Sequence, residues 1–536
     1  MQDPLTDTGV ATPNRGDGAA THGPAANGRR DPSAVGQIRG SSLLLVGRVI
    51  ALGMDFATQV LLVRYLAKSE FGAFALALSM VSLATTVSLL GLERTTSRFA
   101  PIYEEQRDYD RMFGTIVLIV GTVVILGFTI VLGAFAFRDV LRDTVVGDEQ
   151  GMGLLLILIL LAPIQALDSL LISLFATFAG ARAIFFRRYV LAPALQLGVV
   201  LLLVFQHSDV RFVAVGYVLA AGAGVALYSV ILVRLLQREG LLAHFRVRGL
   251  RLPVRAIFGF SLPLLASDLV FVLRASLIVI LLGAFRGTEE VAEYRAVLPI
   301  AAQALIVSTS FKYLYTPAVS RLFARGKRQE IHDVYWQSAA WIAMITFPIF
   351  AAGFALAKPV VLLLFGERYA EASTVLSVLA VGYYVHASVG FNNLTLRVYA
   401  RVRYMVAADL ATAAISLVAS LALLPTFGAM GAAAVTTATL IIQNGLYQVG
   451  LHRSTDVRGF DPLYARVYLA ALAAGITLLA IQIALEPPLF VGIVLVGIAS
   501  LALIAVSRDR LRVVETFPEL GRFPIARRMF GSGRAT

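Results

Sequence analysis

Six ionisable side chains interrupt apolar stretches of this sequence and could do chemistry there. They are Arg48, Asp55, Asp168, Asp268, Arg274 and Lys312. A charge inside a hydrocarbon layer costs about 2.5–3.5 kcal/mol on insertion scales, so such residues usually face a cavity or an ionic partner. Arginine binds phosphate oxygens through a planar pair of N–H donors. A buried carboxylate, such as Asp168, can take up a proton reversibly. The set predicts a site for an anionic ligand, with acidic groups that couple or gate.

The spacing of these residues adds to that prediction. Arg48 and Asp55 are seven residues apart, so a helix places them on nearly one face, with Gln59 one turn further. When the chain is shifted by about 220 residues, Arg48 corresponds to Asp268, and Asp55 falls one position from the counterpart of Arg274. We therefore expect these four residues to line a central cavity between two halves. The alternatives are buried salt bridges that fix helix register, and, for Arg48 and Lys312, side chains that reach the lipid headgroups.

The elements that must carry these side chains are membrane-spanning helices. Of 536 residues, 58% are hydrophobic and 15% charged, and the mean hydropathy is +0.79, where soluble domains are about a quarter charged. The apolar segments are 41–63, 71–92, 113–137, 152–178, 187–206, 212–236, 257–285, 294–315, 335–356, 371–396, 404–424, 428–450, 463–485 and 488–507. Each has about the ~20 residues that a helix needs to cross the hydrocarbon core, and none alternates as a barrel strand does. The sequence predicts an all-α integral membrane protein of about 14 transmembrane helices.

The basic residues sort by loop, which predicts the orientation. Most of the 46 Lys and Arg residues fall on one side of the predicted membrane, including Arg94 after the second span and the group Arg182, Arg187 and Arg188 at the start of the fifth. The basic side faces the cytoplasm, so we expect a multi-pass protein of the cytoplasmic membrane with both termini inside the cell. This sorting and attraction to anionic lipids account for the net charge of +13, and no nucleic acid partner is expected.

The chain divides at a basic connection that reads QREGLLAHFRVRGLRLPVR, from Gln237 to Arg255. Its leucines and arginines favour a position on the membrane surface. The segment after it resembles the start of the chain only weakly, so the sequence leaves a true internal repeat open. The expected organisation is a disordered cytoplasmic tail at 1–37, an N-lobe at 38–236, a linker at 237–256, a C-lobe at 257–452, two further spans at 453–507 and a basic tail at 508–536.

Several chemistries are not expected from this sequence. It has no cysteine, which removes disulfides, thiolate nucleophiles and cysteine-ligated metals. Its histidines show no ligand spacing, so neither a metal site nor a cofactor is predicted. The loops on the outer side are short, with no room for an external catalytic domain.

The residues resemble the polysaccharide and oligosaccharide-lipid flippases of the multidrug/oligosaccharidyl-lipid/polysaccharide exporter superfamily. The resemblance lies in GSSLLLVGRVIALGMDFATQVLLVRYLAKSEFGAFALALS from Gly40, LLGLERTTSRFAP from Leu89, FSLPLLASDLVFVL from Phe260, FGERYAEASTVLSVLAVG from Phe365 and LPTFGAMGAAAVTT from Leu424. It implies fourteen helices in two pseudo-symmetric six-helix lobes plus two C-terminal helices, and alternating access. One departure is Arg274 with Ala275, where many relatives look acidic, so ion-coupling residues are not carried over.

The sequence thus predicts a flippase that moves a polyprenyl-pyrophosphate-linked oligosaccharide for cell-surface polysaccharide biosynthesis. Arg48, Arg274 and Lys312 are the expected substrate-binding residues, and Asp55, Asp268 and Asp168 the expected coupling or gating residues. The expected partners are the lipid-linked glycan, membrane lipids and glycosyltransferases of the same pathway. The alternatives are a cation-coupled exporter of small molecules and an enzyme, either a membrane glycosyltransferase or a glycan polymerase.

Overall fold

A computed structural model describes residues 34–147, 149–178, 181–389 and 391–511, and all secondary structure in these ranges is helical. The predicted terminal tails lie mostly outside the described residues. The first group of helices, here called the N-terminal lobe, is α1 (Ala34–Tyr65), α2 (Lys68–Leu89), α3 (Leu92–Glu105), α4 (Tyr109–Ala136), α5 (Arg138–Leu141), η1 (Arg142–Val146), α6 (Glu149–Leu158), α7 (Leu161–Phe178), α8 (Ala181–Ile184), η2 (Phe185–Leu191), α9 (Ala192–Gln206) and α10 (Val210–Arg238).

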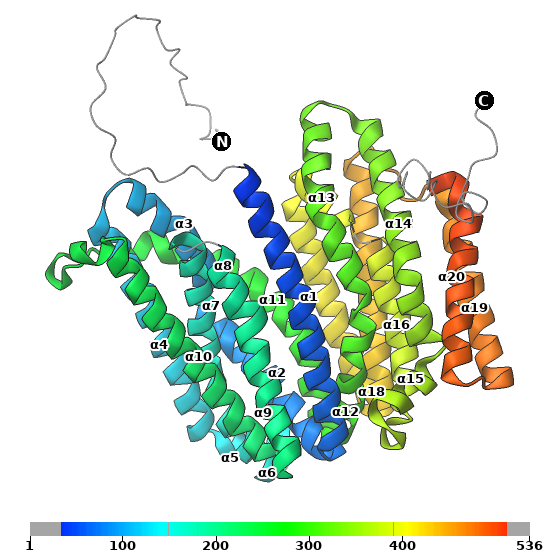
Figure 1. The fold of residues 1–536 in the computed structure, drawn as a ribbon, viewed down its shortest axis with the longest axis horizontal. Helices are drawn as coiled ribbons and strands as arrows, with labels where there is room; N and C mark the ends of the chain where they lie inside the picture. The colour runs from blue at the N-terminus through cyan, green and yellow to red at the C-terminus, as the bar shows by residue number, and fades with distance from the viewer. Residues whose placement is uncertain (1–33, 148, 179–180, 390, 512–536) are drawn as a thin grey trace, which may run out of the picture.

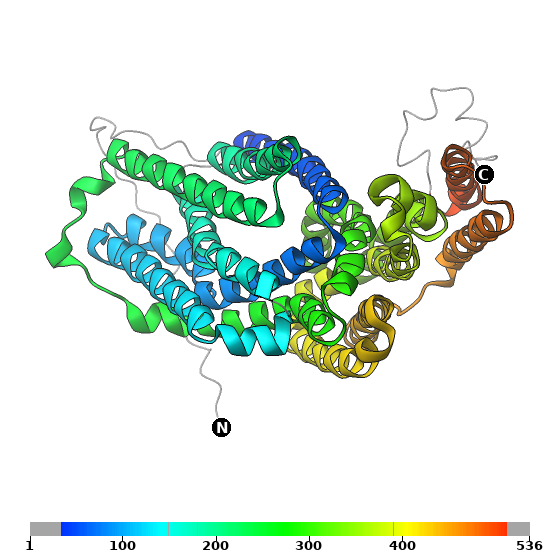
Figure 2. The ribbon, with the colours of Figure 1, turned by 90° about the horizontal axis from the view of Figure 1, so that it is seen from below.

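The remaining helices follow a connection that contains η3 (Leu241–His244) and η4 (Val247–Gly249). The C-terminal lobe is α11 (Val254–Arg286), α12 (Thr288–Ala302), α13 (Ala304–Ala324), α14 (Arg328–Phe354), α15 (Ala357–Phe365), η5 (Glu367–Tyr369), α16 (Ala372–Ser388), α17 (Asn392–Val398) and α18 (Val402–Ser454). After η6 (Pro462–Tyr464), α19 (Ala465–Leu485) and α20 (Leu489–Leu511) pack against α14 at the edge of the bundle (Figures 1 and 2).

The described helices include twelve that are long and apolar enough to cross a membrane, or thirteen when the bent pair formed by α12 and α13 counts as one more. One of the twelve, α18, has 53 residues, which at 1.5 Å per residue is about 80 Å and far exceeds a single crossing. Gly428 interrupts it with φ 53° and ψ −131°. When α18 is counted as two crossings, the thirteen candidate spans become fourteen, the number of apolar segments in the sequence. The protein is therefore a multi-pass membrane protein.

Local signals in the sequence explain where helices begin and why α18 bends. Asp108 and Asp209 precede α4 and α10, and their carboxylates accept the backbone N–H groups of Arg111 and Phe212, both at 3.1 Å. At the bend in α18, the backbone N–H of Ala429 donates to the Glu290 carboxylate of α12 at 2.7 Å. A side chain at position 428 would collide with that carboxylate. The positive φ and the close approach both require glycine there.

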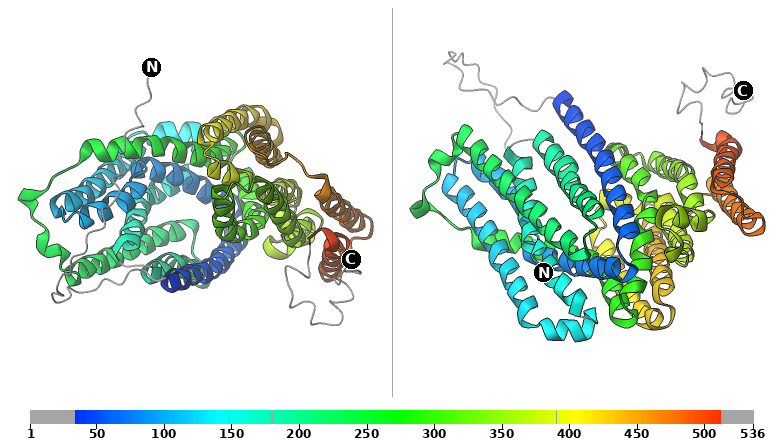
Figure 3. Two further views of the ribbon diagram at one scale, coloured as in Figure 1. Left: turned by 90° about the horizontal axis from the view of Figure 1, so that it is seen from above. Right: turned by 60° about the horizontal axis from the view of Figure 1, so that its bottom comes forward.

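The connection between the lobes packs on the N-terminal lobe. The ring of His244 stacks on Tyr109 of α4 at 4.2 Å, and Phe245 lies edge-on to Phe113 at 5.2 Å. Val247, two residues further on, is 73% exposed. Figure 3 shows this connection at the outer edge of the N-terminal lobe, on the side of the molecule opposite α19 and α20.

The lobes contact each other along α2, which packs against α11 and α12, and also where α1 ends. One buried apolar cluster there includes residues of α1, α2, α12, α15 and α16. Arg64 near the end of α1 donates to the carbonyl oxygens of Leu363 and Leu364 near the end of α15, at 2.5 and 2.8 Å. Arg368, which follows α15, donates to the carbonyl oxygens of Val63 and Arg64. The last carbonyls of a helix attract cations, so each lobe caps a helix end of the other. We call this the α1–α15 contact.

Two further polar contacts join the lobes near this point. Lys68, the first residue of α2, forms an ion pair with Glu293 of α12 at 2.5 Å. The side-chain amide of Gln59 donates to the carbonyl oxygen of Arg295 at 3.2 Å. This end of the bundle is therefore held together by side chains that both lobes contribute.

Candidate functional site

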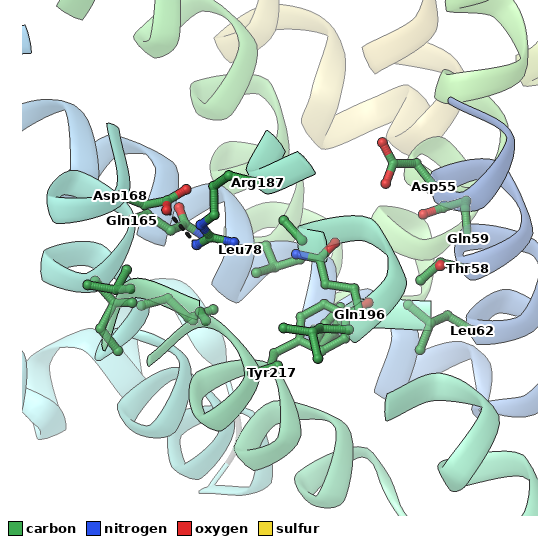
Figure 4. Close-up of a pocket in the computed structure, with 18 residues that line it drawn as sticks. Asp55, Thr58, Gln59, Leu62, Leu78, Gln165, Asp168, Arg187, Gln196 and Tyr217 are labelled. Atoms are coloured by element: carbon green, nitrogen blue, oxygen red, sulfur yellow. Dashed lines mark ion pairs between the residues drawn. The ribbon is translucent and has the colours of Figure 1, made fainter. Parts of the chain in front are cut away.

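A cavity of about 370 Å³ lies inside the N-terminal lobe between α1, α2, α7, η2, α9 and α10 (Figure 4). Its volume falls within the range of small-molecule sites, about 300–1,000 Å³. The lining is Asp55, Thr58, Gln59, Leu62, Phe74, Leu78, Leu161, Ile164, Gln165, Asp168, Arg187, Ala192, Leu195, Gln196, Tyr217, Ala220, Ala221 and Val225. Eight of these side chains are polar, which is unusual for the interior of a membrane-spanning bundle.

An ion pair forms one wall of the cavity. Arg187 of η2 lies 2.5 Å from Asp168 of α7, and the arginine side chain is only 4% exposed. Its guanidinium carbon lies 5.4 Å from the ring centroid of Tyr228 on α10. The planar group also lies against Gly224, where an added Cβ would be 3.0 Å from its atoms. Gly224 therefore provides the space that Arg187 occupies.

The backbone that carries Arg187 is a π-helix, a form that often marks functional sites. η2 also packs against α1, because a Cβ on Gly47 would lie within 3.0 Å of Phe185 and Tyr189. The ion pair at the cavity and the position of α1 are thus linked through one short segment.

The opposite wall comes from α1. Asp55, Thr58 and Gln59 project from it toward the cavity (Figure 4). The hydroxyl of Thr58 donates to the carbonyl oxygen of Met54 at 2.8 Å, and Gln59 binds α12 as described above. Asp55 has no ion pair or hydrogen bond with any residue that the structure describes, and its side chain is exposed to the cavity. It is the acidic group of the site that has no cationic partner in the described chain.

Two more polar side chains lie between these walls. Gln196 of α9 sits over Tyr217 of α10 in Figure 4, and neither side chain forms a hydrogen bond within the described parts of the chain. The hydroxyl of Thr85 lies 3.4 Å from the side-chain oxygen of Gln165. Amide and hydroxyl groups that a fold does not use among themselves remain available to a ligand or to water.

Arg274 lies in the C-terminal lobe, within a hydrogen-bonded chain. Its guanidinium on α11 donates to the side-chain oxygen of Gln443 at 2.7 Å, and the amide of Gln443 donates to Asp409 at 2.7 Å. The hydroxyl of Tyr447 donates to the same carboxylate oxygen. The charge of Arg274 therefore faces an amide, while the carboxylate of this hydrogen-bonded chain is one step further away.

The other predicted residues lie on three different helices. Asp268 of α11 forms an ion pair with Arg94 of α3 at 2.7 Å. Arg48 of α1 is partly exposed, and it has no ion pair or hydrogen bond within the described ranges. Lys312 of α13 is exposed. Of the six predicted side chains, only Asp55 and Asp168 line the N-terminal cavity within the described chain.

Arg187 is a functional candidate that the sequence did not single out. Its position at the start of an apolar segment suggested a cytoplasmic loop, but it is buried within a membrane-spanning segment, Phe185–Gln206, and paired with Asp168. Hydropathy cannot tell an arginine that reaches toward water from one that turns inward. A usable signal was Asp168 itself, because a carboxylate well inside a span usually faces a cavity or a cationic partner.

In fold, the helical bundle is similar to solved membrane transporters, among them a member of the multidrug/oligosaccharidyl-lipid/polysaccharide exporter superfamily. A solved lipid II flippase, MurJ, in an inward closed conformation, matches with a TM-score of 0.65 and 13% identity over 88% of this chain and 99% of that one. An inward-facing multidrug resistance transporter of the MATE family matches with a TM-score of 0.56 and 16% identity, over 76% and 98%. A third solved structure, the MATE multidrug transporter DinF-BH, gives 0.52 and 13%, over 80% and 98%.

The sequence comparison identifies the particular family. The family model described as polysaccharide biosynthesis protein matches residues 38–311, about half of the chain. The chain belongs to this family, in agreement with the resemblance of its sequence to the flippases of that superfamily. No curated protein sequence matches the chain significantly.

Proposed function

We propose that this protein is an alternating-access flippase that carries a polyprenyl-pyrophosphate-linked oligosaccharide across the cytoplasmic membrane for the synthesis of cell-surface polysaccharide. The observation that supports this most directly is the α1–α15 contact. Arg64 and Arg368 join the two lobes at one end of the bundle through a few hydrogen bonds to helix-end carbonyls. These polar contacts, together with the apolar packing beside them, form an interface between the lobes that would open and re-form during alternating access.

The intramembrane charges support an anionic headgroup as the cargo. Arg48 has no partner in the described chain, and Arg274 faces an amide oxygen, so both guanidinium groups keep donors for the pyrophosphate. Lys312 is the third proposed contact. Among the acidic residues, the Asp268–Arg94 pair joins α11 to α3 and suits gating. Asp55 and Asp168 suit coupling, since both face the N-terminal cavity.

The proposed setting follows from the distribution of basic residues in the sequence. The side rich in arginine faces the cytoplasm, and both termini lie there. The lipid tail of the cargo stays in the bilayer while the headgroup passes between the lobes. Glycosyltransferases that build the glycan are the proposed neighbours in the membrane. The protein needs no covalent chemistry for this role, so we do not propose an enzyme.

A cation-coupled exporter of small molecules is the second candidate, and the N-terminal cavity favours it. Two carboxylates, Asp55 and Asp168, face this cavity against one arginine, Arg187, among the described lining residues, which leaves a net negative charge. An acidic cavity suits a cationic drug. The fold of the two MATE transporters is also compatible with this role.

The experiment that tests the proposal is flipping of a glycan-lipid in vesicles that contain the wild type or Arg274→Ala at equal insertion. We expect the wild type to flip the lipid and the variant to lose most of the rate. Full activity of the variant would leave Arg274 a structural residue. Absence of flipping by the wild type on any polyprenyl-pyrophosphate glycan, together with export of an organic cation, would favour the second candidate.

A further inference from the structure

We propose that the N-terminal cavity is a sugar subsite, which binds the first sugar residues of the glycan while the pyrophosphate remains outside it, at Arg48. This inference rests on the proposed flippase function and assigns one part of the cargo to one place. The residues that would contact the sugar are Asp55, Gln165, Gln196 and Tyr217, with the Asp168–Arg187 pair at the far wall (Figure 4).

The chemistry of the lining fits hydroxyl groups. A sugar hydroxyl both donates and accepts, and carboxylate, amide and phenol side chains can satisfy it in either direction. Asp55 supplies acceptors only, Gln196 supplies both kinds, and Tyr217 adds a hydroxyl together with the face of a ring. Phe74 lies edge-on to Tyr217, with centroids 5.4 Å apart. An aromatic wall beside polar groups offers contact to the C–H face of a sugar ring as well as to its hydroxyls.

Several polar groups of this cavity have no protein partner. Asp55, Gln196 and Tyr217 form no hydrogen bond with the described residues. The side chain of Arg187 is only 4% exposed, yet its Nε atom lacks an acceptor within the same described ranges. Buried polar atoms are nearly always satisfied, so the Nε atom of Arg187 points to an occupant of the cavity. Asp55, Gln196 and Tyr217 face the cavity and remain available to bind that occupant.

The charge of the cavity argues for the sugar rather than the phosphates. The single arginine among its described lining residues is already 2.5 Å from Asp168, and Asp55 adds a second negative charge. A pyrophosphate at this position would meet two carboxylates and, within the described lining, no cation other than the paired arginine. A neutral, hydroxyl-rich group has no such repulsion and gains from carboxylate acceptors.

The geometry of α1 sets the distance between the two parts of the cargo. Arg48 and Asp55 are seven residues apart on nearly the same face, which is about 10 Å along the helix axis. The sugar is attached directly to the second phosphate. A pyrophosphate at Arg48 therefore places the first sugars at the level of Asp55, beside the cavity. On this one helix, Arg48 would bind the phosphates and Asp55 would bind the sugar.

The first test compares two lipids in nanodiscs, undecaprenyl pyrophosphate with and without one N-acetylglucosamine. The variants are Gln196→Leu and Tyr217→Phe, and the matched control is Gln206→Leu, on the same helix as Gln196 but exposed beyond the cavity. We expect each variant to weaken binding of the sugar-bearing lipid by about tenfold and to leave the sugar-free lipid unchanged. The control should bind both lipids as the wild type does. An equal loss for both lipids, or no loss for either, overturns the subsite.

A second measurement uses the absence of cysteine from the sequence. Gln196→Cys introduces the one thiol of the chain, and its alkylation by a small maleimide reports access to the cavity. The sugar-bearing lipid should slow alkylation severalfold, and the sugar-free lipid should not. Equal protection by both lipids would contradict the sugar subsite but remain consistent with the proposed flippase function. If wild type binds neither lipid and neither protects the thiol, the proposed function fails first and the subsite with it.

Discussion

The interiors of the two lobes both hold polar side chains but arrange them differently. In the C-terminal lobe, the side chains of Arg274, Gln443 and Asp409 bind one another in sequence at 2.7 Å for each step. In the N-terminal lobe, Asp55, Gln196 and Tyr217 surround a cavity and bind no described residue. Polar side chains thus bind one another in the C-terminal lobe and remain available to a ligand in the N-terminal lobe.

This difference distinguishes polar groups that stabilise the fold from polar groups that are available to bind a ligand. A hydrogen-bonded chain stabilises the lobe that contains it, and loss of one member leaves its neighbours unsatisfied. Side chains that line a cavity without partners add little to stability, so a role in binding is the better account of their presence in a membrane protein. Substitutions of Gln443 and of Gln196 should therefore separate loss of stability from loss of transport.

The largest effect on stability is expected at the ion pair of the N-terminal lobe. Arg187→Gln leaves Asp168 without its cation beside a polar cavity, and loss of one partner of a buried pair costs about 3–5 kcal/mol. We expect a clear fall in the thermal midpoint in nanodiscs and partial recovery in the double variant with Asp168→Asn. If Arg187→Gln melts like the wild type, the pair does not hold the wall of the cavity.

The α1–α15 contact should give the next largest effect, on accessibility. Arg368→Ala removes donors to two carbonyls at the end of α1, and lost charged hydrogen bonds are worth about 1.5–3 kcal/mol. We place Ala220→Cys in the cavity as the reporter thiol and add an impermeant maleimide from the side where α1 ends. Labelling should rise at least tenfold in Arg368→Ala, because each 1.4 kcal/mol or so corresponds to a factor of about ten. Unchanged labelling would mean that other contacts keep this end closed.

Gln443→Leu tests the C-terminal lobe. It leaves Arg274 and Asp409 without their bridge, and we expect a loss of about 1–3 kcal/mol in stability. Gln196→Leu exchanges the same residue types in the N-terminal lobe, where no described partner is lost, and should leave the thermal midpoint nearly unchanged. Equal destabilisation by the two variants would remove the contrast between the lobes.

A smaller effect is expected at Gly224. A Cβ there would lie 3.0 Å from the guanidinium of Arg187, and such overpacking costs about 1–3 kcal/mol. Gly222→Ala on the same helix is the control, because its Cβ would meet only Ile164, at 4.0 Å, among the described residues. We expect Gly224→Ala alone to lower the thermal midpoint and the flipping rate. Equal behaviour of the two variants would show that Arg187 can move aside.

The smallest effect is expected outside the membrane. Arg142 between α5 and α6 binds the side chains of Asp143 and Glu149, and these hydrogen bonds raise its pKa. The cluster is exposed to solvent, where ion pairs contribute little. Arg142→Ala should match the wild type in thermal midpoint and in flipping. A marked loss would indicate that this connection has a role beyond the ion pairs.

Much of the fold could be predicted from the sequence, because the cost of exposing polar groups to lipid determines where apolar helices lie. Each predicted segment falls on helices, although some cover two consecutive ones, such as α6 with α7 and α12 with α13. Two of the segments are the halves of α18 on either side of Gly428. The individual charges inside those helices were also visible. Their partners were not, since partners depend on how helices pack. Asp268 binds Arg94 and Asp168 binds Arg187, and both arginines were expected at the cytoplasmic edge.

The cavity itself could not be predicted for the same reason. Gln196 and Tyr217 are ordinary members of apolar segments in the sequence, and only the packing of α9 against α10 and α1 brings them to one space. Arg274 is the opposite case, because its charge is obvious in the sequence. Its hydrogen-bond partner Gln443 lies on another helix and could not be predicted.

The central claim is that the protein moves a lipid-linked glycan, and one measurement tests it directly. Purified protein in vesicles is given undecaprenyl pyrophosphate that bears a labelled N-acetylglucosamine, and the fraction of label reached by a membrane-impermeant reagent is followed over time. The account predicts that label crosses with this protein and stays in place in vesicles without it. Equal rates with and without the protein, for this and longer glycans, would contradict the account.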